Sequence, residues 1–291
     1  MVQYRSFSRT LFQIFNYTFF LVFSLSILVP FINSISVSLS SPGAITSGKV
    51  GLWPVGFQLN AYKQIIGNST FIRSFLNTVG LTAINTVLSV GISLCAAYAL
   101  AHKLFVGRRV AFTYILITMF FSGGMIPTYL LVRGLGLGNT YWALILPGLV
   151  SPFQIILYKN IIDQLPKELM ESAEMDGAGE FSLLFRIVLP LVLPMTMAFV
   201  IFSAVGHWNT WFDVLLYIKD KSMWTLQYQL REILSTSALQ ADPANPFRDL
   251  AVHPENVKMA ALMITILPIV VIYPFVQKYF IHGQFVGAVK G

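Results

Sequence analysis

The sequence predicts an all-α membrane protein with six transmembrane helices. Hydrophobic residues make up 56% of the 291 residues, charged residues make up 11%, and the mean hydropathy is +0.70. Soluble domains usually carry about 25% charged residues, so this much apolar surface is expected only where lipid covers it. Backbone amides find no water inside a bilayer, and helices are therefore the form expected for the apolar runs.

Six runs are long enough to cross the hydrocarbon, which takes roughly 20 residues of helix. They cover about residues 11–38, 71–100, 110–132, 141–161, 190–217 and 257–280. Three runs contain a proline (Pro30, Pro127 and Pro268), which kinks a helix unless neighbours satisfy the freed carbonyl. The whole chain, 1–291, is predicted to form a single transmembrane domain.

The basic residues predict the orientation. The short loop after the second run carries three cations, Lys103, Arg108 and Arg109. Short basic loops stay cytoplasmic, and an even number of spans puts both termini on that side. Segment 163–190 is then cytoplasmic, whereas loops 40–70 and 218–256 are external. The net charge of +7 is explained by this topology and by lipid headgroups, so no nucleic acid partner is expected.

The polar residues form no recognisable catalytic or metal-binding set. The four histidines are scattered without metal-ligand spacing. The stretch GAITSGKV at 43–50 fits part of a phosphate-loop pattern, but Val50 stands where Ser or Thr is needed and no strand precedes it. We therefore expect no cofactor and no ATPase site in this chain.

The most acidic stretch is LPKELMESAEMDGAGEFSLLFRIVLP, residues 165–190. Pro166 suits the first turn of a helix and Gly177 a left-handed stop. A second helix is expected from about Gly179 through Ile187. A helix this short is marginal in water, and acidic residues are repelled by the anionic inner leaflet. The segment is therefore expected to need a protein partner.

The acidic segment also carries a motif with a recognisable spacing. The spacing PxELxExAxxDGA, followed by Phe181, Ile187 and Leu-Pro at 189–190, resembles the EAA loop of permease subunits in binding-protein-dependent ABC importers. Further similar segments follow in order along the chain: GFQLNAYKQII, FLNTVGLT, AAYALA, SGGMIPTYLLVRGLGLGNTYWALILP and FIHGQFVGAVKG. The first and last of these are similar to the maltose-type carbohydrate branch, in its G-like permease subunit. Ser172 departs from the pattern by replacing the first Ala of the loop's triplet.

The resemblance implies the type I ABC importer permease fold, with a cytoplasmic coupling helix between spans 4 and 5 that lies in a groove of an ATPase subunit. The residues implied for this coupling are Glu168, Glu171, Ser172, Ala173, Asp176, Gly177 and Phe181. The C-terminal tail, with Gly287 and Lys290, is implied to contact the ATPase dimer.

The implied partners are a second homologous permease subunit, two cytoplasmic ATPase subunits that bind ATP and Mg, an extracellular or periplasmic solute-binding protein, and membrane lipid. The implied location is the bacterial inner membrane, with cytoplasmic N- and C-termini. The chain itself is expected to be a transport subunit and not an enzyme.

Two groups of external residues are candidates for handling substrate. Those expected to line its pathway are His207, Trp208, Asn209 and Trp211, because Trp208 and Trp211 are three apart and would share a helix face. Those expected to contact the binding protein are Trp224, Tyr228, Arg231 and Phe247. The alternative is that the tryptophans form an interfacial belt.

The resemblance implies import of a carbohydrate, most similar to the subgroup that serves oligosaccharides, including uronate oligomers such as alginate or pectin fragments. A permease for a non-sugar solute and a secondary transporter are the alternatives. A secondary transporter usually needs ionisable residues within the membrane, and only Asp213 approaches such a position. A membrane enzyme would need a clustered acid, base or metal set.

Overall fold

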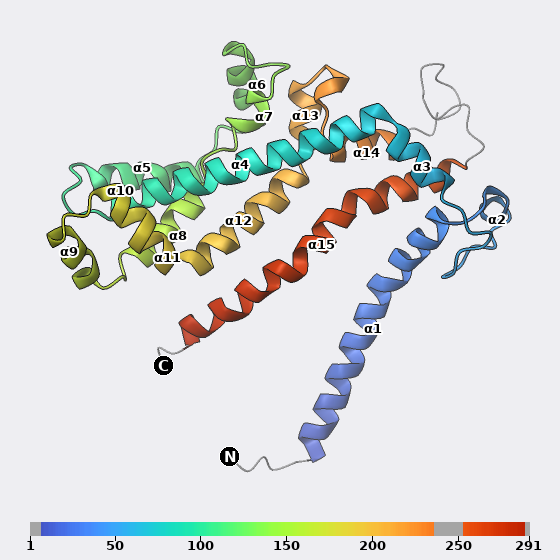
Figure 1. Cartoon of the computed structure of the whole chain (residues 1–291), viewed down its shortest axis with the longest axis horizontal. Helices are drawn as coiled ribbons and strands as arrows, with labels where there is room; N and C mark the ends of the chain where they lie inside the picture. The colour runs from blue at the N-terminus through green and yellow to red at the C-terminus, as the bar shows by residue number, and fades with distance from the viewer. Residues whose placement is uncertain (1–6, 236–252, 289–291) are drawn as a thin grey trace. The chain divides into compact units, whose positions relative to one another are not determined.

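The computed structural model describes residues 7–235 and 253–288, and in these ranges the protein consists of helices and connecting turns without a strand (Figure 1). It divides into two compact units. The first unit takes the chain up to Ser69 together with Glu232–Ile266, and the second takes Thr70–Arg231 together with the chain from Leu267.

The first unit holds α1 (Phe7–Ser38), α2 (Pro42–Thr46), α3 (Asn60–Gly67) and the beginning of α15 (Pro254–Ala288). The second unit begins with α4 (Ser69–Ala101), α5 (Arg108–Phe120), α6 (Met125–Gly134), α7 (Trp142–Ile145) and α8 (Pro152–Ile162). It continues with α9 (Lys167–Met175), α10 (Glu180–Ser182), the π-helix η1 (Leu183–Val188), α11 (Leu189–Leu191) and α12 (Leu193–Trp208). It then takes α13 (Phe212–Tyr217), the short 3₁₀ helix η2 (Lys221–Met223), α14 (Leu226–Ser235) as far as Arg231, and α15 from Leu267.

Three helices of the described chain are long and apolar enough to cross a membrane: α1, α4 and the part of α15 up to Pro274. Two bent pairs bring the number to five if each pair is one span: α5 with α6, bent by 115°, and Glu180–Leu191 with α12, bent by 85°. Only 6% of the most apolar window of α1 is buried. Such a surface needs lipid or another chain to cover it. The exact count of six spans stays a prediction.

Three of the expected spans, 110–132, 141–161 and 190–217, are not single continuous helices. The first run breaks because Gly124 takes φ 86° and ψ 176°, a backbone conformation essentially restricted to glycine. The second breaks between Ile145 and Pro152, in a stretch with two prolines. The third ends its main helix at Trp208 and resumes at Phe212.

The second unit has two apolar cores that position its functional ends. One joins α4, α8, η1 and α12, where the rings of Tyr158 and Phe199 meet edge to face with centroids 4.8 Å apart. The other joins α4, α6, α7, α13 and α14 around Val214 and Tyr217. Polar bonds reinforce both cores; for example, Gln154 Nε2 donates to Ser203 Oγ over 3.0 Å.

In the first unit, Asn256 holds the start of α15 against the end of α1. Its side chain is 0% exposed, and Nδ2 donates to the carbonyls of Val37 (2.7 Å) and Ser40 (2.8 Å). The last carbonyls of a helix have no partner within that helix. The Val37 carbonyl also accepts from the Ser40 N–H and the Ser40 carbonyl from Gln58 Nε2, so Asn256 adds a buried second donor to each and ties α15 to the end of α1.

Replacing Asn256 with Ala should lower the free energy of unfolding by about 2 kcal/mol, because it removes a buried donor from two carbonyls. The measurement is thermal unfolding of the purified detergent-solubilised protein. Asn60→Ala is the matched control, since Asn60 is exposed and its side chain bonds only to Gln58. Equal melting temperatures for the two variants would show that Asn256 does not stabilise this end of α1.

Candidate functional site

The acidic segment folds as the sequence predicts, with one helix that stops at a glycine. Helix α9 begins after Pro166, one residue later than expected, and Asp176 is its C-cap. Gly177 has φ +81°; its N–H donates to the Glu174 carbonyl, and the N–H of Ala178 donates to the Ala173 carbonyl, both over 2.9 Å. This is the Schellman arrangement, which satisfies the last carbonyls of a helix. The predicted left-handed stop is confirmed.

One face of α9 is half-buried against the protein, and the other face exposes apolar side chains as well as carboxylates. Met170 and Ala173 are half-buried, and Met170 packs against the core that joins α4, α8 and α12. Carboxylates and apolar side chains share the exposed surface. Its acidic members are Glu168, Glu171, Glu174 and Asp176, and its large apolar members are Leu169 (48% exposed) and Met175 (89%). Phe181 of the following helix α10 is also exposed (79%).

Ser172 does not disturb this arrangement. Its hydroxyl donates to the Glu168 carbonyl over 2.7 Å, one turn back in the same helix. The departure from the alanine of the family pattern is therefore absorbed within α9, with the side chain exposed.

The segment is fastened to α4 through Glu180. The Tyr98 hydroxyl donates to Glu180 Oε2 over 2.6 Å, and His102 Nε2 lies 3.7 Å from Glu180 Oε1. This contact joins residues 82 positions apart, and no periodicity in the sequence points to it. A tyrosine near the end of an apolar run and a glutamate at a helix start were the only local signals.

Between α10 and α12 the backbone widens into the π-helix η1 and then bends. Pro190 lies just after η1, and Pro194 lies just after the bend at Val192. A proline removes one N–H donor and crowds the carbonyl four residues before it. Local π-helical adjustment is a common way to accommodate this. The second helix expected over about 179–187 therefore exists as two consecutive pieces, α10 and η1.

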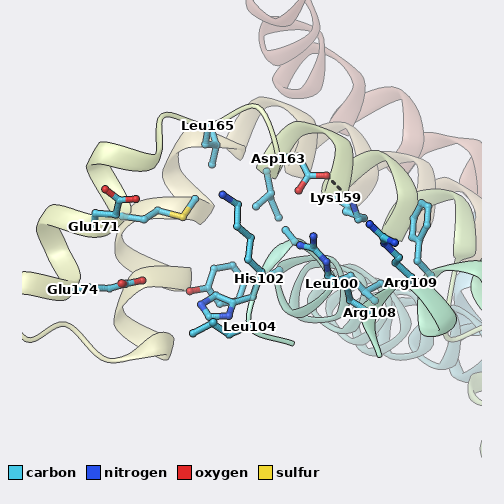
Figure 2. Close-up of a pocket in the computed structure, with 16 residues that line it drawn as sticks. Leu100, His102, Leu104, Arg108, Arg109, Lys159, Asp163, Leu165, Glu171 and Glu174 are labelled. Carbon is cyan, nitrogen blue, oxygen red and sulfur yellow. Dashed lines mark hydrogen bonds and ion pairs between the residues drawn. The ribbon is translucent and has the colours of Figure 1, made fainter. Parts of the chain in front are cut away.

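A cavity of about 640 Å³ lies between α9 and the loop that joins α4 to α5. In Figure 2, Arg108, Arg109 and Lys159 lie on one side, and Glu171 and Glu174 on the other. Lys159 is paired with Asp163, one turn further along α8. The cavity thus separates a basic wall from an acidic one, so a movement of α9 would change the electrostatic energy across it.

At the predicted external end, the structure brings the two groups of candidate residues together. Trp211 lies under the Arg231 guanidinium, with 3.9 Å from Cζ to the ring centroid. Asn209 Oδ1 accepts a hydrogen bond from Gln227 Nε2 over 2.9 Å. The expected pathway residues are therefore joined directly to the loop expected to contact the binding protein.

The premise that Trp208 and Trp211 share a helix face is wrong, because α12 ends at Trp208. Trp208 is 7% exposed and meets the Phe75 ring edge to face at 5.9 Å. Tyr228 is also buried, in the core around Val214, and meets Trp224 edge to face at 4.8 Å. The buried rings of Trp208 and Tyr228 therefore pack inside the protein and are not exposed for contact with a ligand.

The remaining candidates divide by where they lie. His207 is half-buried in the last turn of α12. Gly287 falls within the bounds of α15. Phe247 and Lys290 lie outside the described residues.

Two asparagines were missed in the sequence. Asn77 Nδ2 donates to the carbonyls of Ser222 (2.8 Å) and Trp224 (3.1 Å), and Asn139 Oδ1 accepts from the N–H groups of Lys219 and Asp220, both over 2.9 Å. Asn139 has φ 58°. The dipeptide Gly138-Asn139 is a turn signal that could have identified it.

Comparisons with known proteins agree on one family. The family described as "Binding-protein-dependent transport system inner membrane component" matches residues 2–284. Protein LplC of Bacillus subtilis is 40% identical over 264 residues, covering 91% of this chain and 90% of that protein. The polygalacturonan/rhamnogalacturonan transport system permease protein YtcP of Bacillus subtilis is 38% identical over 282 residues, covering 97% and 99%.

Among solved structures, a bacterial ABC transporter involved in the import of the acidic polysaccharide alginate has a similar chain. The TM-score is 0.90 at 31% identity, covering 96% of this chain and 100% of that chain.

Substituting Tyr98→Phe should weaken the attachment of α10 to α4 by about 1 kcal/mol, the usual net value of one hydrogen bond. That corresponds to roughly fivefold more frequent opening, measurable as faster hydrogen exchange of the amides around Glu180. Tyr114→Phe is the control, because Tyr114 is 68% exposed. Unchanged exchange in Tyr98→Phe would mean that the hydrogen bond does not hold the segment.

Proposed function

The chain belongs to the family of binding-protein-dependent transport system inner membrane components, and on that premise we propose that it is the permease subunit of an ATP-driven carbohydrate importer. The observation that carries its coupling role is α9, a helix whose apolar side chains Leu169 and Met175 are exposed together with four carboxylates, followed by the exposed Phe181 of α10.

The carbohydrate class is supported by the similar proteins. YtcP is named for polygalacturonan and rhamnogalacturonan, and the similar solved chain belongs to an alginate importer. Polygalacturonan, rhamnogalacturonan and alginate are polysaccharides that contain uronate units. An oligosaccharide, with uronate oligomers such as alginate or pectin fragments included, is therefore the substrate proposed for this chain.

We propose that α9 is the coupling helix and docks in a groove of a cytoplasmic ATPase subunit. Nine residues of helix are marginal in isolation, and here the Schellman stop and the Glu180 contact hold the helix in shape before a partner arrives. A preformed helix loses less conformational entropy on docking. Its carboxylates would meet basic residues, and Met175 and Phe181 would fill apolar depressions.

The complete transporter would contain a second, homologous permease subunit and two ATPase subunits that bind ATP and Mg. ATP would close the ATPase dimer and draw the two coupling helices together, and the permease pair would change from inward-facing to outward-facing. The coupling has to provide only a few kcal/mol of difference between the two states. In this arrangement segment 163–190 and both termini are cytoplasmic.

On the outer side, a loaded solute-binding protein would deliver the sugar to the loop that follows α13. The Arg231–Trp211 and Gln227–Asn209 contacts connect that loop to the end of α12. A push on the loop would therefore reach the proposed pathway through these direct contacts. Trp224, Arg231 and Phe247 are the side chains proposed for the contact, whereas Tyr228 is buried.

Two substitutions in the coupling segment test the proposal. In Gly177→Val, a β-branched residue at φ +81° costs roughly 1–2 kcal/mol. This cost shifts the equilibrium between the formed and the opened stop of α9 by about tenfold toward the opened state. In Glu171→Lys, the charge reversal should repel a basic groove. Both variants should lose most of the substrate-stimulated ATPase activity of the complete transporter while the subunit stays in the membrane.

Gly48→Val is the matched control. Gly48 also has a positive φ (+65°), and a Cβ at either glycine would meet no atom within 4 Å. It lies in the predicted external loop, so a similar strain there should leave stimulated ATPase activity intact. Wild-type stimulation in both Gly177→Val and Glu171→Lys would exclude α9 as the coupling helix.

A further inference from the structure

A second cavity, of about 290 Å³, lies at the predicted external end of the second unit and plays no part in the coupling just described. Its lining comes from two stretches of chain, one from α6 and the turn after it, the other from the end of α13. The lining residues are Tyr129, Arg133, Gly136, Gly138, Asn139, Leu216, Tyr217 and Lys219.

Two tyrosines give the cavity an ordered aromatic wall. The rings of Tyr129 and Tyr217 are stacked, with centroids 5.9 Å apart and 19° between their planes. Tyr217 is 7% exposed and belongs to the core around Val214. Arg133 Nη1 donates to the Tyr129 hydroxyl over 3.1 Å, and Arg133 Cζ lies 5.8 Å from that ring. The guanidinium is therefore held at the rim before any ligand binds.

Asn139 holds the two stretches together. Its backbone N–H donates to the Tyr217 carbonyl over 2.8 Å, and its side-chain oxygen accepts from the N–H groups of Lys219 and Asp220. Three hydrogen bonds thus fix the chain that carries Lys219 opposite α6. The cavity has rigid walls on both sides, which lowers the entropy cost of binding.

The residues that line the cavity carry a net positive charge. Two of the lining residues, Arg133 and Lys219, are cations, and none of those in the described chain is acidic. The neighbouring Asp220 carboxylate instead accepts from the Ser222 N–H over 2.8 Å, and this backbone hydrogen bond lowers the pKa of Asp220. Asp213, one turn before Tyr217, does not line the cavity. Such a lining favours an anionic ligand.

Size and chemistry narrow the ligand further. Small-molecule sites usually enclose about 300–1,000 Å³, so this cavity suits a single ring and not a long oligomer. An Arg guanidinium matches a carboxylate in a bidentate geometry, and aromatic walls offer contact to the apolar face of a ring. A carboxylate side chain of a docking protein would need the cations but not an aromatic cavity of this size.

We propose that this cavity is a receiving subsite for one carboxylate-bearing sugar unit of the incoming oligosaccharide. Arg133 and Lys219 bind the carboxylate, and the Tyr129–Tyr217 wall contacts the sugar ring. The proposal rests on the function proposed above and adds to it that the substrate is acidic and that this permease subunit itself contacts it.

The test uses the complete transporter in proteoliposomes, with trigalacturonate as the probe. Arg133→Gln and Lys219→Gln should each reduce uptake at saturating loaded binding protein about fivefold, and the double variant should reduce it further. Arg133→Lys keeps the charge and should retain at least half of the uptake. Arg73→Gln is the matched control, because Arg73 is an exposed cation at the outer end of α4 that does not line the cavity.

The dependence of ATPase activity on binding-protein concentration distinguishes a sugar carboxylate from a carboxylate of the binding protein. A sugar subsite leaves the concentration of binding protein that half-maximally stimulates the ATPase unchanged in these variants. A rise in that concentration, with uptake restored at saturation, would assign the cations to a binding-protein carboxylate and overturn the proposal. An equal loss in Arg73→Gln would point to lipid headgroups and also overturn it.

Comparing the uptake of a neutral and an acidic oligosaccharide distinguishes failure of the acidic subsite from failure of the proposed carbohydrate importer. If the wild-type transporter carries a neutral oligosaccharide such as arabinotriose but not trigalacturonate, the acidic subsite is wrong while the carbohydrate importer stands. If it carries no carbohydrate at all, the proposed function fails and the subsite fails with it.

Discussion

The need to satisfy every backbone polar group without water determines this structure. In lipid only helices achieve this for a spanning chain, and the described residues of this protein are helices joined by short turns. Where a helix stops, specific groups take over. Gly177 and Ala178 close α9, the Ser151 hydroxyl accepts from Gln154 N–H at the start of α8, and Asn209 Nδ2 donates to the Val205 carbonyl at the end of α12.

The interrupted helices lie next to the proposed functional surfaces. The stop at Gly177 allows α9 to project its carboxylates and the exposed side chain of Met175 away from the core. The break after Trp208 turns Trp211 toward Arg231. The turn at Asn139 links α6 to the end of α13. Each break thus places side chains that a continuous helix would point into lipid or into a neighbouring helix.

Part of this arrangement could be predicted from the sequence. Composition predicted the all-helical membrane class, and the Gly177 stop followed from a local rule for left-handed glycine. The position of the break in run 110–132 was not predicted, because hydropathy averages over Gly123 and Gly124, whose backbone freedom ends the helix. The Tyr98–Glu180 and Asn77–Ser222 bonds join residues far apart in the chain, so no local pattern could reveal them. The spacing of the tryptophans also could not show that α12 ends at Trp208.

The proposed contact between α9 and an ATPase subunit can be measured by cross-linking from introduced cysteines, because the chain has a single cysteine of its own to remove. In a Cys95→Ser background, Met175→Cys places a thiol at an 89% exposed position of α9, and Ser47→Cys places one in the predicted external loop. A cross-linker with one thiol-reactive end and one photoreactive end, applied to the assembled transporter, should join position 175, and not position 47, to the ATPase subunit. Failure to cross-link from position 175 in a complex that still copurifies, or efficient cross-linking from position 47, would contradict the account.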